Sequence, residues 1–293
     1  IVMVLLSHAI ASREYSWSWK IEHIRYIFSF GWPLMLNGFL LFGILQMDKT
    51  IVGSTLGMQQ LGWFSAAFTL VLFPSSIMMK ASQSFLLPIL SKQQSKRELF
   101  SLGSISVIQI SFICGVLLSI GVTTGGASLI LVLFGSRYET AIEYVMLLGI
   151  MQGLRLSRSG PVTVAISKGR TTMPLKVNLM RSSAIPLALI TVWLGYGIKG
   201  IILSGIVGEI LAVSLSLFLV RRFIKSGIQH CLWKFTASLA IGVFVVGVSF
   251  RYFDGSRPVF EIFLSGLIVL ISGGLCIILM PDFLRWLKQA NDM

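Results

Sequence analysis

The sequence predicts an all-α polytopic membrane protein, and two observations lead to this prediction. The 293-residue chain is 55% hydrophobic and only 12% charged, with a mean hydropathy of +0.86, whereas a soluble domain carries about 25% charged residues. Long apolar windows also recur along the chain, separated by short charged or Gly/Pro-containing stretches. A membrane-spanning helix needs about 20 predominantly apolar residues, so we expect these windows to be transmembrane helices.

The windows predict eight spans, at residues 29–54, 62–90, 101–123, 139–157, 174–195, 199–220, 232–250 and 259–280. Residues 1–7 are also apolar and are interpreted as the end of a further span that begins upstream. The expected organisation is a truncated helix with a cytoplasmic linker at 1–28, a six-helix bundle at 29–220 and two additional helices at 221–293. No connection is long enough for a soluble domain.

The first full span is uncharged from Ser29 to Met47. Pro33 lies in its first turn, where the missing N–H does not weaken the helix. Asn37 and Asp48 share one face by helical spacing, and Asp48 and Lys49 are placed near the opposite membrane surface by the helical rise.

Three further prolines, Pro74, Pro88 and Pro186, lie inside predicted spans and indicate kinks. The longest connection, 159–173, contains Gly160-Pro161 followed by an apolar run. We expect it to lie as a short amphipathic helix at the cytoplasmic surface.

The basic residues indicate the orientation of the chain. Of the 24 Lys and Arg, 17 fall in or beside the connections on one side and 4 on the other. Because Lys and Arg are enriched in cytoplasmic loops, this bias predicts a cytoplasmic C-terminus.

Composition also argues against several functional classes. The net charge of +13 is not concentrated on one soluble face, so nucleic acid is not an expected partner. Cys114, Cys231 and Cys276 have no metal-type spacing and are interpreted as packing residues. No Walker-type loop, carboxylate pair or Ser/His/Asp set suggests an enzyme or a resident cofactor.

Cations inside predicted spans are the candidate binding residues, because such charges usually face a bundle interior or a water-filled cavity. Lys80 belongs to a polar stripe on its helix, and Arg181 shares a face with Asn178. Arg155 and Arg158 form a further stripe with Gln152, expected at the cytoplasmic end of their span. One interpretation is a cationic cavity for a lipid-linked anion, since Arg forms bidentate hydrogen bonds to phosphate oxygens.

Other interpretations of these cations remain open. Arg155 and Arg158 are also compatible with ordinary positive-inside residues near the surface. Lys80 is compatible with a side chain that extends to the headgroups.

Glu209 is the deepest carboxylate, predicted near the middle of its span on a small, polar face with Gly205, Ala212 and Ser216. A mid-membrane carboxylate can bind Na⁺ or carry a proton, and we expect Glu209, with Asp48, to couple an ion gradient. The alternative is a structural pair between Glu209 and Arg181 or another cation.

Several short motifs resemble the multidrug, oligosaccharidyl-lipid and polysaccharide (MOP) exporter superfamily. They are Phe30-Gly31-Trp32-Pro33, Asn37-Gly38, Asp48-Lys49-Thr50-Ile51-Val52-Gly53, Leu61-Gly62-Trp63-Phe64, Leu154-Arg155-Leu156-Ser157-Arg158, Gly169-Arg170-Thr171 and Asn178-Leu179-Met180-Arg181. The passage from residue 29 to 64 is similar to the start of the second half of bacterial O-antigen-type polysaccharide flippases.

This resemblance implies a MATE-like bundle with the N-terminal half missing from the sequence, and alternating access in the bacterial inner membrane. The implied substrate is an undecaprenyl-diphosphate-linked oligosaccharide for surface polysaccharides such as lipopolysaccharide. Lys80, Arg155, Arg158 and Arg181 would bind it, and Na⁺ or H⁺ would drive transport. The alternatives are a cation-coupled multidrug or metabolite antiporter of the same superfamily, a membrane-embedded polysaccharide polymerase or ligase, and an inactive gene remnant.

Overall fold

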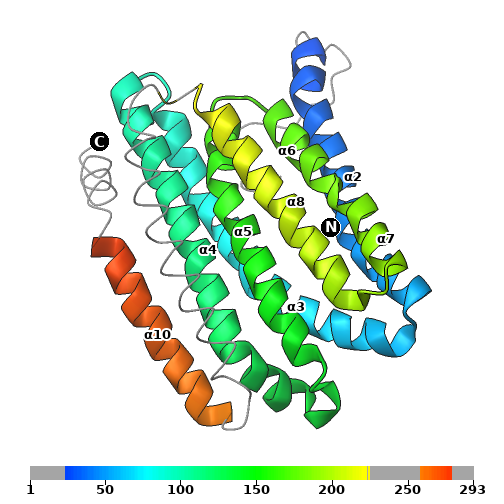
Figure 1. Ribbon diagram of the computed structural model, residues 1–293. Coiled ribbons are helices and arrows are strands. Elements are labelled where there is room, and N and C mark those ends of the chain that lie inside the picture. The colour runs from blue at the N-terminus through cyan, green and yellow to red at the C-terminus, as the bar shows by residue number, and fades with distance from the viewer. Residues whose placement is uncertain (1–23, 223, 225–257, 279–293) are drawn as a thin grey trace, which may run out of the picture.

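The computed structural model describes residues 24–222, 224 and 258–278 (Figure 1). The elements in chain order are α2 (Ile24–Thr55), α3 (Met58–Lys92), α4 (Arg97–Phe134), the 3₁₀ turn η1 (Ser136–Tyr138), α5 (Ala141–Ser167), α6 (Thr172–Ser182), α7 (Ala184–Trp193), α8 (Gly197–Val220) and α10 (Pro258–Ile278). No strand occurs in this part of the chain, and the all-α prediction is confirmed.

Six helical segments are long and apolar enough to cross a membrane: α2, α3, α4, α6 with α7, α8 and α10. They correspond to six of the eight predicted spans. Another predicted span, 232–250, lies outside the described residues, as do residues 1–23 of the predicted N-terminal linker. The remaining one, 139–157, forms part of α5, which is less apolar than the other spans.

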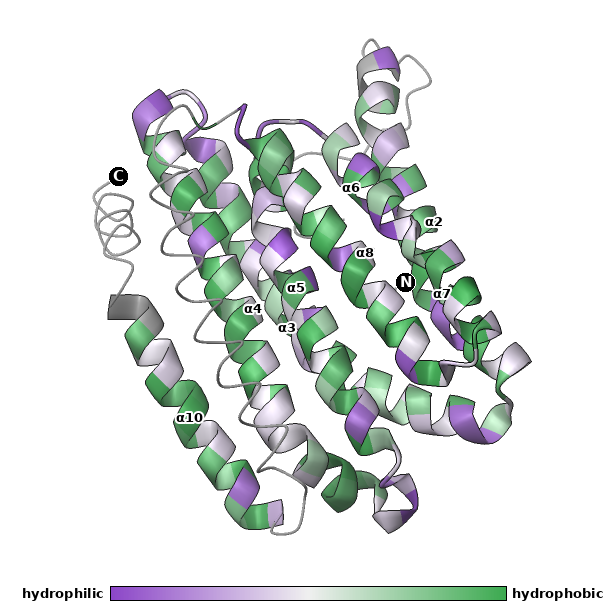
Figure 2. Cartoon of the chain, in the orientation of Figure 1, coloured by the Kyte–Doolittle hydropathy of each residue, from purple (hydrophilic) through white to green (hydrophobic). Residues whose placement is uncertain are grey.

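Helix α5 can carry more polar residues than the other spans because it lies at the centre of the bundle. It packs against α4, α3 and α8, and at 27 residues it is about 40 Å long, enough to cross a bilayer. Figure 2 shows hydrophilic segments on α5 and α8. A helix surrounded by other helices does not need an apolar surface toward lipid, which explains its low hydropathy.

Helices α4 and α5 approach each other closely along a line of small residues. A Cβ atom added to Gly153 would lie 2.5 Å from the carbonyl oxygen of Gly115, and one added to Gly115 would lie 2.3 Å from that of Gly153. Glycine is therefore required at both positions for this backbone-to-backbone contact, which is a common packing mode for membrane helices.

The expectation of a surface helix at 159–173 is wrong. Helix α5 continues without interruption through Gly160-Pro161 to Ser167, and most of this extension is buried. Its end is held by the turn between α3 and α4, where the Gln94 amide donates to the Ser167 carbonyl. It is also held by the start of α4, where the Lys168 ammonium lies 4.0 Å from the centre of the Phe100 ring. Tertiary contacts thus stabilise a helix that Gly-Pro was expected to end.

The other helices complete the bundle on either side of α5 (Figure 1). On one side α10 packs along α4, where the Ser128 hydroxyl donates a 2.6 Å hydrogen bond to the buried Glu261 carboxylate. On the other side α8 packs against α6 and α7, which contact α2. A single residue, Ser183, separates α6 from α7, and Pro186 follows in the first turn of α7.

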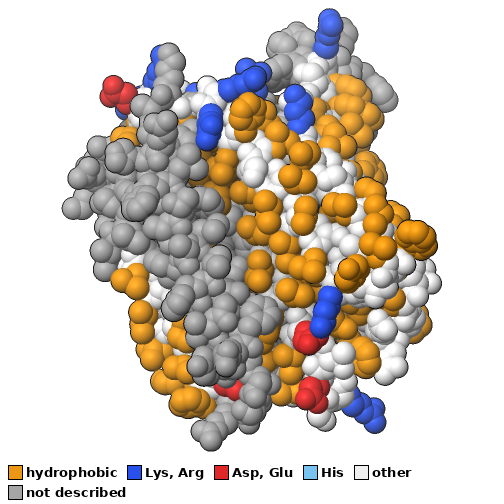
Figure 3. All heavy atoms as spheres, viewed as in Figure 1, with side chains coloured by type: hydrophobic (Ala, Val, Ile, Leu, Met, Phe, Trp, Pro, Cys, Tyr) orange, Lys and Arg blue, Asp and Glu red, His pale blue; other side chains and the backbone are white. Residues whose placement is uncertain are grey.

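The outer surface is suited to a lipid environment. Large apolar side chains such as Phe39, Phe73, Trp193 and Phe263 are exposed, and hydrophobic atoms cover much of the visible described surface in Figure 3. Lys and Arg gather at the upper end in that view, where the chain turns from α3 to α4 and leaves α8. The molecule is a multi-pass membrane protein by these features.

Candidate functional site

A buried ion-paired cluster joins α5, α6 and α8 near the middle of each span. The Glu209 carboxylate on α8 is fully buried and lies between two guanidinium groups. Its Oε2 is 3.1 Å from Nε of Arg158 on α5, and its Oε1 is 2.6 Å from Nε of Arg181 on α6. One carboxylate therefore links three helices.

Small residues on α8 allow this convergence. A Cβ atom on Gly208 would lie 3.0 Å from the carbonyl oxygen of Arg181 and 2.7 Å from the Ala184 Cβ, so α8 touches the α6–α7 break directly. A Cβ atom on Gly205 would lie 2.7 Å from the Met151 sulfur on α5. The predicted small face of α8 is thus the face that packs into the bundle.

Two asparagines extend the cluster to α2. Nη1 of Arg158 donates a 2.8 Å hydrogen bond to Oδ1 of Asn178, and Nδ2 of Asn178 donates a 2.7 Å hydrogen bond to Oδ1 of Asn37. With Glu209 this gives a hydrogen-bonded chain across α2, α6, α5 and α8. Both the Nε and the Nη1 of Arg158 are engaged, so its side chain is held firmly.

Unused donors remain on the other members of the cluster. Arg155 and Arg181 are 6% and 4% exposed, yet in the described structure neither Nη1 atom has a hydrogen-bond partner. The same holds for Nε2 of Gln152, one turn before Arg155, whose Oε1 accepts a 3.4 Å hydrogen bond from Ser75 on α3. Buried polar atoms without partners are rare and costly. Oε1 of Glu209 also lacks a hydrogen bond, but it is ion-paired with Arg181. The three cluster atoms with no partner of either kind are donors, which favours an anion.

The cluster carries a net positive charge. Three guanidinium groups, those of Arg155, Arg158 and Arg181, face the carboxylate of Glu209 and, within electrostatic range, that of half-buried Asp48. Three positive and two negative charges leave an excess of one positive charge. Inside a membrane protein such an excess is unfavourable unless an anion or water compensates it.

The structure therefore brings together most of the predicted site residues. Arg155, Arg158 and Arg181 converge as expected, but the first two lie in the middle of α5 and not at its cytoplasmic end. Their interpretation as surface positive-inside residues is wrong, because both are buried. Removing these two from the cytoplasmic count leaves 15 basic residues against 4, so the orientation prediction is unchanged.

The other predicted residues are placed differently. Glu209 forms the structural pair that was the alternative to ion coupling, and it pairs with two arginines. Lys80 is exposed on α3, on the same side of that helix as exposed Phe73, and is not part of the cluster. The roles of Lys80 in substrate binding and of Glu209 and Asp48 in ion coupling stay predictions.

Two features were missed by the sequence reasoning. The Asn37–Asn178 hydrogen bond joins residues 141 positions apart, which no local pattern indicates. The buried Glu261 at the start of α10 was a detectable signal, since it is the one carboxylate in that helix.

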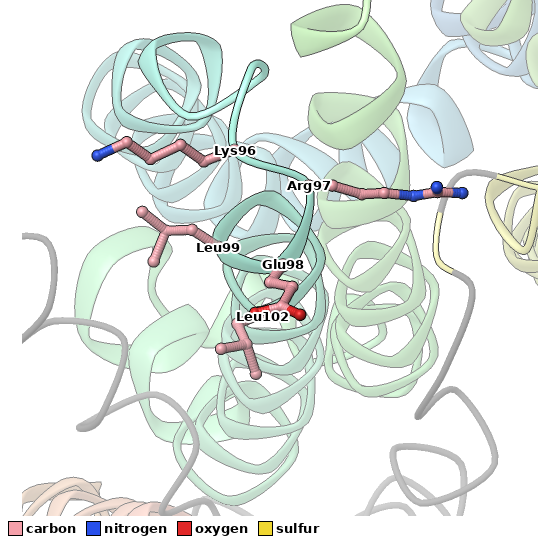
Figure 4. A pocket seen from close by; sticks show the side chains of 5 residues that line it. All are labelled: Lys96, Arg97, Glu98, Leu99 and Leu102. Atoms are coloured by element: carbon pink, nitrogen blue, oxygen red, sulfur yellow. The ribbon is translucent and has the colours of Figure 1, made fainter.

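A separate pocket of about 430 Å³ lies at the start of α4, lined by Lys96, Arg97, Glu98, Leu99 and Leu102 (Figure 4). The side chains of Lys96 and Arg97 point in opposite directions in this view. The pocket therefore does not present converging polar groups.

Metal-binding and redox centres find no support in the described part of the chain. No group of three His, Cys, Asp or Glu side chains there could hold a metal ion. Cys114 is a half-buried free thiol on α4, while the side chains of Cys231 and Cys276 lie outside the described residues.

Comparisons with known proteins give two matches, both to proteins of polysaccharide biosynthesis. Residues 1–143 match a family model described as polysaccharide biosynthesis protein. The chain is also 26% identical over 248 residues to the amylovoran biosynthesis protein AmsL of Erwinia amylovora, covering 83% of this chain and 57% of AmsL. The chain thus spans little more than half the length of that relative. No solved structure matches it.

Proposed function

We propose that the protein moves a lipid-linked oligosaccharide across the bacterial inner membrane, a proposal that the matches to polysaccharide biosynthesis proteins support. The substrate is an oligosaccharide on an undecaprenyl diphosphate carrier, and the protein transports it without chemical conversion. The C-terminus lies in the cytoplasm, in agreement with the distribution of basic residues.

The observation that carries this proposal is the buried arginine cluster with unused donors. Arg155 and Arg181 each have a free Nη1 in the interior of the bundle. With Arg158 they carry three positive charges, against two negative charges on Glu209 and Asp48. A diphosphate supplies both the negative charge and the acceptor oxygens that these guanidinium groups lack. A cationic drug would be repelled by the same cluster, which argues against the antiporter alternative.

The arrangement of helices supports alternating access. The three linked helices include the α6–α7 pair, which is interrupted at Ser183 next to Arg181. Because the cluster is closed in this structure, a large headgroup reaches it only when these helices separate. Binding of the anion to one arrangement better than to the other would shift the population between them.

The proposal is tested by complementation of bacteria that lack their own polysaccharide flippase. Expression of the full protein should restore surface polysaccharide, and Arg181→Glu should abolish restoration at normal membrane abundance. The matched control is Arg170→Gln, which removes a positive charge from the exposed turn between α5 and α6 and should retain activity. Full activity of Arg181→Glu would remove the arginine cluster from the transport site.

Complementation also distinguishes transport from synthesis. A flippase restores polysaccharide in cells that lack only the flippase, and these cells otherwise accumulate the lipid-linked precursor on the cytoplasmic side. Restoration instead in cells that lack only the polymerase would favour the polymerase alternative.

A further inference from the structure

The position of Glu209 has a consequence for which anions the arginine cluster accepts. In this structure the carboxylate occupies the Nε atoms of both Arg158 and Arg181. The Nε edge of Arg181 is open to a phosphate only if Glu209 withdraws from it. The protein thus carries its own anion at the place where a substrate anion would bind.

Displacement of this internal anion depends on the charge of the incoming group. A phosphodiester headgroup, as in the abundant anionic phospholipids, carries one negative charge, equal to that of the carboxylate it would replace. The exchange brings no net electrostatic gain and loses the positioning of a tethered side chain. A lipid diphosphate carries at least two charges, so it neutralises the cluster better than Glu209 does.

The hydrogen bonds of Arg158 restrict the competition between Glu209 and an incoming anion to Arg181 and Arg155. Arg158 is held by Asn178, which is held in turn by Asn37, so Arg158 remains in place when Glu209 moves. A diphosphate that displaces the carboxylate from Arg181 also finds the free Nη1 of Arg155.

We propose that Glu209 is a specificity-determining residue, an internal anion that excludes singly charged phospholipid headgroups from the arginine cluster and yields to a lipid diphosphate. This inference rests on the proposed function, since it concerns the same site. It explains why a carboxylate stands at the centre of a site meant for an anion. It also assigns Glu209 a role other than ion coupling.

The test is equilibrium binding of farnesyl diphosphate to the full protein in phosphatidylcholine nanodiscs, with and without phosphatidylglycerol as the singly charged competitor. In the wild type, phosphatidylglycerol should leave the dissociation constant nearly unchanged. In Glu209→Gln it should weaken apparent binding about tenfold or more, the effect of one charge-assisted contact. Glu143→Gln is the matched control, because this carboxylate is exposed and paired with Lys199, and it should behave as the wild type.

A double variant tests whether Glu209 acts by occupying Arg181 or by lowering the net charge of the cluster. Arg158→Met with Glu209→Gln leaves Arg155, Arg181 and Asp48, which sum to one positive charge as in the wild type. If Glu209 acts by occupying Arg181, the double variant should be as sensitive to phosphatidylglycerol as Glu209→Gln. Wild-type behaviour of the double variant would overturn the inference, and this variant also decides the matter if Glu209→Gln alone fails to fold.

The last experiment uses inorganic pyrophosphate as a competitor that has no prenyl chain. It should compete with farnesyl diphosphate in the wild type, because the site recognises charge; failure to compete would assign recognition to the prenyl chain and overturn the inference. Weaker binding by both Glu209 variants in pure phosphatidylcholine would mean that Glu209 organises the site instead of competing for it. Absence of farnesyl diphosphate binding in every variant would refute the anion site itself, and with it the basis of the proposed function.

Discussion

The close contact between α4 and α5 gives a sharp prediction for Gly153→Ala. An added Cβ would lie 2.5 Å from the Gly115 carbonyl oxygen and 1.9 Å from the Ser119 hydroxyl. The hydroxyl can rotate away, but the carbonyl belongs to the backbone. To restore a separation of 3.0 Å, below which Cβ contacts essentially do not occur, the helices must part by at least about 0.5 Å.

Overpacking of this kind costs about 1–3 kcal/mol, whereas Gly→Ala in an unconstrained helix gains up to about 1 kcal/mol in helix propensity. The matched control is Gly38→Ala on α2, where an added Cβ has no neighbour within 4 Å. We expect Gly153→Ala to lower the midpoint of thermal unfolding in detergent, measured by size-exclusion chromatography, and Gly38→Ala to leave it unchanged or raise it.

The comparison tests the register of α5, on which the whole site depends. Gly153 faces α4, so Arg155 and Arg158, two and five residues later, are directed to other neighbours. Equal or higher stability of Gly153→Ala relative to Gly38→Ala would show that α4 and α5 do not meet along this line. The positions of both arginines would then be in doubt.

Two further predictions concern the hydrogen-bonded network and the exposed cation. Asn178→Leu should destabilise the protein by about 1–3 kcal/mol, because it leaves the buried donor of Arg158 without its acceptor; thermal unfolding in detergent measures this, and an unchanged midpoint would contradict it. Lys80→Gln should reduce transport less than Arg155→Gln, because Lys80 is exposed and lies apart from the cluster; equal loss of surface polysaccharide in the complementation assay would place Lys80 in the site.

The sequence predicted the helices well because each span is a local property. Windows of about 20 apolar residues identified the helices now seen as α2 to α10 within the described ranges. The end of α5 was the exception, since Gly160-Pro161 is a common break and only contacts with the α3–α4 turn reveal that the helix continues. Tertiary packing overrode the local signal there.

The site could be predicted in part for a related reason. Helical periodicity shows which residues share a face of one helix, and it placed Glu209 on the buried face of α8 correctly. It does not show which faces meet, so it gave Lys80 the same standing as Arg155 and Arg181. The link between Asn37 and Asn178 depends entirely on the packing of α2 against α6 and has no sequence signature.

The proposed function requires that the buried arginines bind the diphosphate of a lipid-linked substrate during transport. The most direct measurement is movement of a fluorescent undecaprenyl-diphosphate-linked sugar across proteoliposomes that contain the full protein. We expect movement by the wild type and by Arg170→Gln, and its loss in Arg155→Gln and Arg181→Gln variants that retain wild-type reconstitution. Undiminished movement in both cluster variants would show that these arginines do not bind the substrate.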